Sequence, residues 1–69
     1  MIDRDRLVEK IPAEATCAET AGWVHFLLSK EGIACEKINI VGYGHTYNTV
    51  DGEIVDIWSY RRGLPEGPN

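Results

Sequence analysis

The strongest hydrophobic pattern of the chain lies at residues 17–30, in the sequence CAETAGWVHFLLSK. Cys17, Ala21, Val24 and Leu28 recur at the spacing that places side chains on one stripe of an α-helix. Two further apolar residues near the end of the segment widen this stripe. The pattern therefore predicts an amphipathic helix over about residues 17–30.

Residues at both ends of this segment are typical of helix termini. Thr16 is followed three residues later by Glu19, which is the spacing of a capping box. Thr16 is then the N-cap residue and Cys17 the first helical residue. Gly32 suits the left-handed conformation that follows a helix, and Lys30 in the last turn suits the helix dipole.

Alternation of apolar and polar residues, typical of half-buried strands, follows the helix in three runs at residues 33–41, 45–50 and 53–58. A glycine-containing turn separates the first two runs. The dipeptide Asp51-Gly52, among the strongest two-residue hairpin signals, separates the last two. We therefore expect an α+β domain in which one central helix packs on a three-stranded antiparallel sheet.

The hairpin signal also predicts a register for the last two strands. If the Asp-Gly dipeptide alone forms the loop, Tyr47 lies opposite Asp56 and His45 lies opposite Trp58. His45 and Asp56 are then diagonal neighbours on one face, with backbones roughly 7 Å apart. That spacing is within reach of a hydrogen bond between an imidazole and a carboxylate.

The length of 69 residues sets the domain organisation. We expect a single minimal domain, with a short helix or arm over residues 1–15 and a flexible Pro/Gly-rich tail over residues 59–69. A domain of this size has a thin core, so a homodimer that covers one face is a further expectation.

Charge and composition narrow the possible partners. The net charge of −4 and the pI of about 4.9 argue against nucleic-acid binding, which needs a basic patch. No long apolar run suggests a membrane span and no signal peptide is evident, so we expect a cytoplasmic protein without membrane partners. Cys17 and Cys35 are expected to be free thiols. With His25 and His45 they match no metal-ligand spacing, and no cofactor or metal is expected.

Three side chains form a candidate catalytic constellation. A thiol in the first turn of a helix is favoured in its thiolate form by the unpaired N–H groups and the helix dipole. His45 would act as the base for Cys17, and Asp56 would orient the imidazole. The backbone N–H of Cys17 would supply one oxyanion donor, as helix N-termini do in general.

The order of these pieces resembles the transglutaminase-like core of the papain-like cysteine enzymes. The matching segments, over about residues 16–58, read CAETAGWVHFLLSKEGIACEKI, HTYNTV, DG and VDIW. The resemblance implies Cys17 as nucleophile, His45 as base and acid, and Asp56 as the residue that orients His45. It implies a cysteine peptidase, amidase or transglutaminase that acts on protein or peptide substrates. Tyr47 stands where that family usually has Trp.

Three aromatic residues near these positions, Tyr43, Tyr47 and Trp58, are candidates for substrate binding or for support of the triad. Other interpretations remain open. Cys17 alone could be a small buried residue of the helix stripe. The chain before Cys17 reads PAEAT and lacks the Gly and the aromatic residue or Gln typical of the family. The alternative function is therefore a non-catalytic binding or inhibitor protein that keeps the fold, including an acidic protein that blocks a partner.

Overall fold

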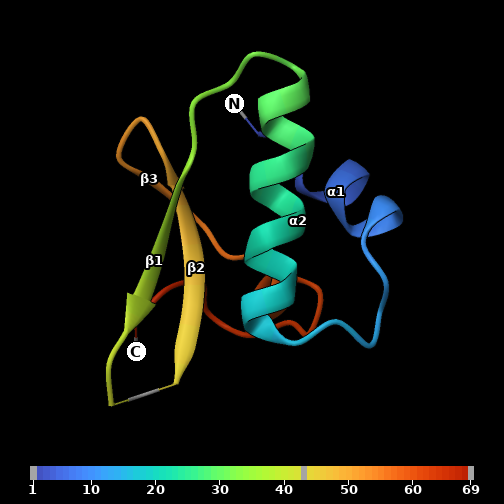
Figure 1. Cartoon of the computed structure of the whole chain (residues 1–69). Helices are drawn as coiled ribbons and strands as arrows, with labels where there is room; N and C mark the ends of the chain where they lie inside the picture. Colours follow the sequence, from blue (N-terminus) through green and yellow to red (C-terminus); the bar gives the residue numbers. More distant parts are fainter. Residues whose placement is uncertain (1, 43, 69) are drawn as a thin grey trace.

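The computed structural model describes residues 2–42 and 44–68. The elements follow in the order α1 (Arg4–Lys10), α2 (Cys17–Lys30), β1 (Glu36–Ile40), β2 (His45–Val50), β3 (Glu53–Val55) and α3 (Ile57–Tyr60). The strands form one antiparallel sheet in the order β1-β2-β3. The long helix α2 runs along this sheet, and α1 lies beyond α2 in the view of Figure 1. The fold is therefore α+β with a three-stranded antiparallel sheet, as expected, but α1 and α3 accompany α2 in place of a single central helix.

Helix α2 begins and ends where the sequence pattern predicts. The Thr16 side chain accepts a hydrogen bond from the Glu19 backbone N–H at 3.1 Å, and the Glu19 carboxylate accepts one from the Thr16 N–H at 2.9 Å. This reciprocal pair is the predicted capping box. Gly32 follows the helix with a φ of +76°, a conformation that favours glycine. The capping box fixes Cys17 at the first position of the helix.

The core lies between α2, the sheet and α1. Its buried apolar side chains come from the three helices, from β2 and β3, and from the segment between α1 and α2: Leu7, Ile11, Ala15, Val24, Leu28, Val50, Val55 and Ile57. One polar group joins two of the elements inside this core, because the Asn48 amide of β2 donates to the Ala21 carbonyl of α2 at 3.1 Å. Asn48 is itself buried, so this bond supplies a partner for a side chain that water cannot reach.

The hairpin between β2 and β3 has the predicted turn. Val50 pairs with Glu53, and Asp51 and Gly52 both have positive φ, at +51° and +80°. Two residues with positive φ are characteristic of the type I′ turn, whose twist suits a hairpin. The register of the loop and of the first pairs is therefore confirmed.

The predicted pairings farther along the hairpin are wrong, because β3 ends at Val55. Asp56 leaves the sheet and becomes the N-cap of α3, where its carboxylate accepts a hydrogen bond from the Ser59 backbone N–H at 3.2 Å. Asp is a poor strand residue and one of the preferred N-cap residues. Asp56 is therefore not opposite Tyr47, and Trp58, which lies in α3, is not opposite His45.

The tail after α3 returns to the body of the molecule. Glu66 forms an ion pair with Arg4 of α1 at 3.0 Å, and Gly67 is buried. This differs from the flexible tail expected from the Pro/Gly-rich sequence, because the described part of the tail is joined to the N-terminal helix. In the described ranges, residues 2–42 and 44–68, no helix has the length and apolar character needed to cross a membrane.

Candidate active site

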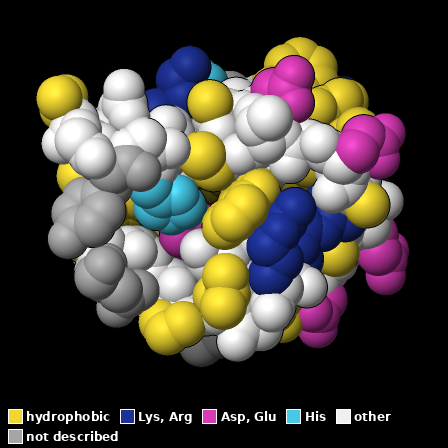
Figure 2. All heavy atoms as spheres, turned by 90° about the horizontal axis from the view of Figure 1, so that it is seen from below, with side chains coloured by type: hydrophobic (Ala, Val, Ile, Leu, Met, Phe, Trp, Pro, Cys, Tyr) yellow, Lys and Arg dark blue, Asp and Glu magenta, His cyan; other side chains and the backbone are white. Residues whose placement is uncertain are grey.

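Three chain segments bring the predicted catalytic residues to one end of the molecule. Helix α2 begins there, β2 begins there, and α3 follows β3 close by, at the lower end in Figure 1. Figure 2 looks onto this end, where a histidine ring lies among hydrophobic side chains, with Lys and Arg side chains beside them. The candidate site is therefore assembled from segments that are far apart in the sequence.

His45 and Asp56 form the central hydrogen bond of the site. His45 Nε2 lies 2.7 Å from Asp56 Oδ2. The His45 side chain is 18% exposed, and the Asp56 side chain is 0% exposed. The predicted contact between imidazole and carboxylate is therefore present. The residue that supplies the carboxylate reaches it from the N-cap of α3 and not from a strand.

Backbone N–H groups hold the Asp56 carboxylate in its charged form. Besides His45, Oδ2 accepts a hydrogen bond from the Gly67 N–H at 2.9 Å, and Oδ1 accepts the bond from Ser59. Burial raises the pKa of Asp56, but the Gly67, His45 and Ser59 hydrogen bonds outweigh it and lower the pKa below the ordinary value. Asp56 is therefore a carboxylate at neutral pH.

The charge of Asp56 determines which nitrogen of His45 carries the proton. An ionised carboxylate can only accept hydrogen bonds, so Nε2 of His45 must donate to it. In the neutral ring, the lone pair is then on Nδ1. His45 thus presents a basic nitrogen on the side of the ring away from Asp56, which is the arrangement that a general base requires.

A second layer of contacts holds the segment that carries Asp56. The Asp56 backbone N–H donates to Glu66 Oε1 at 3.0 Å, and Arg4 Nε donates to the same carboxylate at 3.0 Å. The Arg4 guanidinium also donates to the Ile54 carbonyl at 2.9 Å and contacts Glu53 at 3.2 Å. Helix α1 and the tail thus fix the position of Asp56.

Cys17, the first residue of α2, lies next to the start of β2. Its thiol donates a hydrogen bond to the Gly44 carbonyl oxygen at 3.5 Å, and this carbonyl belongs to the peptide bond that joins Gly44 to His45. Within residues 2–42 and 44–68, the Cys17 thiol makes this hydrogen bond and none with the His45 imidazole. Cys17 is a half-buried free cysteine, and its backbone N–H, at the first position of α2, has no acceptor within the helix.

Two of the three candidate supporting residues contact the imidazole. Tyr47 stacks on His45 with ring centres 6.0 Å apart, and Trp58 meets it edge-on at 5.8 Å. These contacts restrict the plane of the ring. The Arg62 guanidinium lies over Trp58 at 4.0 Å from the ring centre. The third candidate, Tyr43, lies outside the described residues.

The second cysteine has a different environment. Cys35 is free and packs against the hydrophobic core. Burial raises the pKa of its thiol, Asn48 lowers it through a hydrogen bond, and the charge of Glu36 raises it again. The net pKa is above the ordinary value, so Cys35 is a weak nucleophile at neutral pH.

Two cavities flank α2 and its neighbours. One of about 290 Å³ is bordered by His45, Trp58 and the tail, next to the candidate site. A larger one of about 620 Å³ lies against the Trp23 and Phe26 side of α2. Of these two cavities, the smaller one is in contact with the imidazole. No group of three or more His, Cys, Asp or Glu side chains suited to a metal ion occurs in the described part of the chain.

Sequence reasoning missed the residues that hold Asp56. Glu66 and Gly67 contact Asp56 from ten and eleven positions later in the sequence, and Arg4 contacts Glu66 across a separation of 62 residues. The one local signal concerned Asp56 itself, because Asp is a preferred N-cap residue.

Comparisons with protein-family models, with curated proteins and with solved structures find no match for this chain.

Proposed function

We propose that this chain is a thiol-dependent acyl-transfer enzyme with a minimal transglutaminase-like, papain-like core. Cys17 is the nucleophile, His45 the general base and acid, and Asp56 the residue that orients His45. The observation that carries the proposal is the 2.7 Å bond between His45 and the buried carboxylate, next to the peptide group that the Cys17 thiol contacts. A buried, charged partner for a histidine that is mostly buried but still reaches solvent is typical of catalytic pairs.

The reaction proceeds by transfer of the thiol proton to Nδ1 of His45 and attack of the sulfur on a carbonyl carbon of an amide or ester. The C–S bond forms, and the bond to the leaving nitrogen or oxygen breaks as His45 returns the proton to that atom. The backbone N–H of Cys17 stabilises the oxyanion. Water or an amine then resolves the thioester, with His45 again moving the proton.

The thiol must turn from the Gly44 carbonyl toward the imidazole for this chemistry. A neutral thiol is a weak donor, so the 3.5 Å bond to Gly44 is readily exchanged. The proposal requires that rotation about the Cys17 Cα–Cβ bond exchange this contact for an interaction with the basic nitrogen. Free enzymes often tighten such contacts only when substrate binds.

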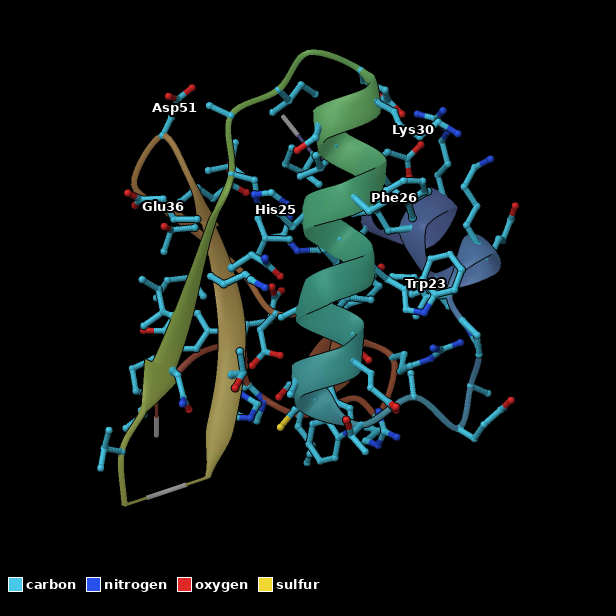
Figure 3. The ribbon with its side chains drawn as sticks, viewed as in Figure 1. Trp23, His25, Phe26, Lys30, Glu36 and Asp51 are labelled. Carbon is cyan, nitrogen blue, oxygen red and sulfur yellow. The ribbon has the colours of Figure 1, made fainter. Side chains whose placement is uncertain are left out.

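The test is alkylation of Cys17 by iodoacetamide, followed by mass spectrometry in a Cys35→Ser background. At about pH 6.5, two units below the ordinary thiol pKa, a free thiol is about 1% ionised. We expect Cys17 to react at least about tenfold faster than N-acetylcysteine, and His45→Ala to remove that advantage. His25→Ala is the matched control, because His25 is an exposed histidine of α2 (Figure 3). Native protein that reacts no faster than the free thiol contradicts the proposal.

A non-catalytic binding protein is the second candidate function. The observation that favours it is the exposed aromatic surface of α2, where Trp23 and Phe26 are 38% and 54% exposed and meet edge-on (Figure 3). Exposed aromatic side chains are frequent in interfaces. The alkylation experiment separates the two functions, because a binding protein does not need a reactive Cys17. Two free cysteines are consistent with the cytoplasmic location that we also propose.

A further inference from the structure

The cavity of about 290 Å³ beside His45 has mostly apolar walls, with Ser59 as a polar member besides His45. Its lining includes Ile40 at the end of β1, Trp58 of α3, and Leu64, Pro65 and Pro68 of the tail. Among the described residues that line it, none is Asp, Glu, Lys or Arg. Arg62 contacts the ring of Trp58 but is not one of the lining residues.

These walls determine which chemical groups the cavity accepts. A charged group placed there would lose its hydration without gaining an ionic partner, whereas an apolar group gains by leaving water. The volume of about 290 Å³ is just below the range of about 300–1,000 Å³ typical of sites for drug-sized ligands. The cavity therefore suits a single group about as large as one amino-acid side chain.

The position of His45 relates the cavity to the reaction. Nε2 of His45 is bonded to Asp56, so the proton for the departing atom comes from the other ring nitrogen. A leaving group that receives this proton must lie against the imidazole, and the imidazole borders the cavity. The lining of the cavity includes His45 but not Cys17, so it adjoins the residue that protonates the departing group and not the residue that takes up the acyl group.

We infer that the cavity formed by Ile40, Trp58 and the tail is the binding site for the leaving group of the substrate, and that this group is uncharged and apolar. The inference rests on the proposed function and specifies its substrate class. The substrates are amides or esters whose departing amine or alcohol carries an aliphatic or aromatic group. The tail, through Leu64 and its neighbouring prolines, then contributes to specificity as well as to the position of Asp56.

The test compares two alkylating agents, chloroacetamide and N-benzylchloroacetamide, on protein in the Cys35→Ser background. In both, the thiolate forms a C–S bond to the CH₂ carbon and chloride departs. The benzyl group stays on the amide nitrogen, which lies one carbon farther from the sulfur than the nitrogen that departs from an acyl substrate, and so probes the same side of the site. For Cys17, the rate with N-benzylchloroacetamide is divided by the rate with chloroacetamide. This ratio is then divided by the same ratio for N-acetylcysteine, which removes the difference in intrinsic reactivity between the two agents. We expect a corrected ratio of about ten or more, because small apolar groups in such pockets change rates by about 10–200-fold.

Variants locate the preference on the protein. Leu64→Ala and Leu64→Glu are expected to bring the corrected ratio toward one, and Leu64 is 49% exposed, so neither substitution disturbs a packed core. Phe26→Ala is the matched control, because Phe26 is similarly exposed but lies on α2, away from the sheet (Figure 3). It is expected to leave the corrected ratio unchanged.

The outcomes separate this inference from the proposed function. A Cys17 that reacts rapidly and depends on His45, but shows a corrected ratio near one, overturns the apolar leaving-group site and leaves the thiol chemistry standing. An unchanged ratio in both Leu64 variants also overturns the site. A Cys17 that reacts with neither agent until the protein unfolds overturns the proposed function and this inference together.

Discussion

Replacement of Asp56 by Asn tests the buried network at its centre. The substitution keeps the shape of the side chain but removes its charge and puts an NH₂ group in place of one carboxylate oxygen. Oδ2 of Asp56 accepts two hydrogen bonds, from His45 Nε2 at 2.7 Å and from the Gly67 N–H at 2.9 Å. If Oδ1 of the new amide keeps the bond to Ser59, its NH₂ group faces the His45 and Gly67 N–H donors. Donors cannot bond one another, so both of those hydrogen bonds are lost.

The magnitude follows from the number of bonds lost in a buried site. Hydrogen bonds to a charged group contribute about 1.5–3 kcal/mol each, and breaking a buried pair costs about 3–5 kcal/mol. We therefore expect Asp56→Asn to lower the free energy of unfolding by about 3–5 kcal/mol. A core of this size supplies only about 3–5 kcal/mol in total, so the variant should be partly unfolded at room temperature.

Urea unfolding followed by circular dichroism, at low temperature where needed, measures this change. Asp51→Asn is the matched control, because Asp51 is an exposed turn residue with a φ of +51°, which Asn tolerates. We expect the control to change the free energy of unfolding by less than about 0.5 kcal/mol. An equally small change for Asp56→Asn would refute the reasoning that the carboxylate organises α3, the tail and His45.

Four further predictions concern stability. The pKa of Asp56 is lowered from 3.8 in the fold, so the stabilisation from its charge is complete above that value and is lost as the pH falls below it. The free energy of unfolding by urea should therefore be smaller near pH 3 than near pH 6. Arg4→Gln should cost about 1–2 kcal/mol because its hydrogen bonds are half-buried, whereas Arg6→Gln, at an exposed ion pair, should cost less than about 0.5 kcal/mol in the same assay. Thr20→Val should stabilise by about 1 kcal/mol, because the buried hydroxyl has no partner in the described part of the chain; a lower urea midpoint would contradict this. Gly22→Ala should raise the free energy of unfolding by about 0.5–1 kcal/mol, seen as a higher thermal midpoint, because Ala favours a helix over Gly and the added Cβ meets no atom within 4 Å.

Local signals in the sequence account for much of the fold. The capping box, the apolar stripe and Gly32 predict α2 with the bounds that it has. The Asp-Gly dipeptide predicts the hairpin turn and its first pairs. Each of these signals depends on residues within a few positions of one another, so the sequence alone contains the information.

The end of the hairpin could not be predicted from alternation. VDIW continues the period-two pattern of a strand, but Asp56 is a stronger N-cap than strand residue, and α3 begins after it. The partners that stabilise this choice, Glu66 and Gly67, lie ten and eleven positions later, within a segment whose prolines and glycines suggest disorder. Nothing local indicates that Arg4 anchors that segment. Long-range contacts of this kind require the three-dimensional structure.

The most direct test of the central claim is to trap the thioester. The protein is mixed with p-nitrophenyl acetate, quenched in acid within one turnover and mapped by peptide mass spectrometry, with Cys17→Ser and His45→Ala alongside. We predict an acetyl group on Cys17, absent from Cys17→Ser and slowed at least about a hundredfold in His45→Ala, as expected for loss of a general base. Acetylation that falls on Cys35 or lysines at the rate of free amino acids, with Cys17 unmodified, would contradict the account.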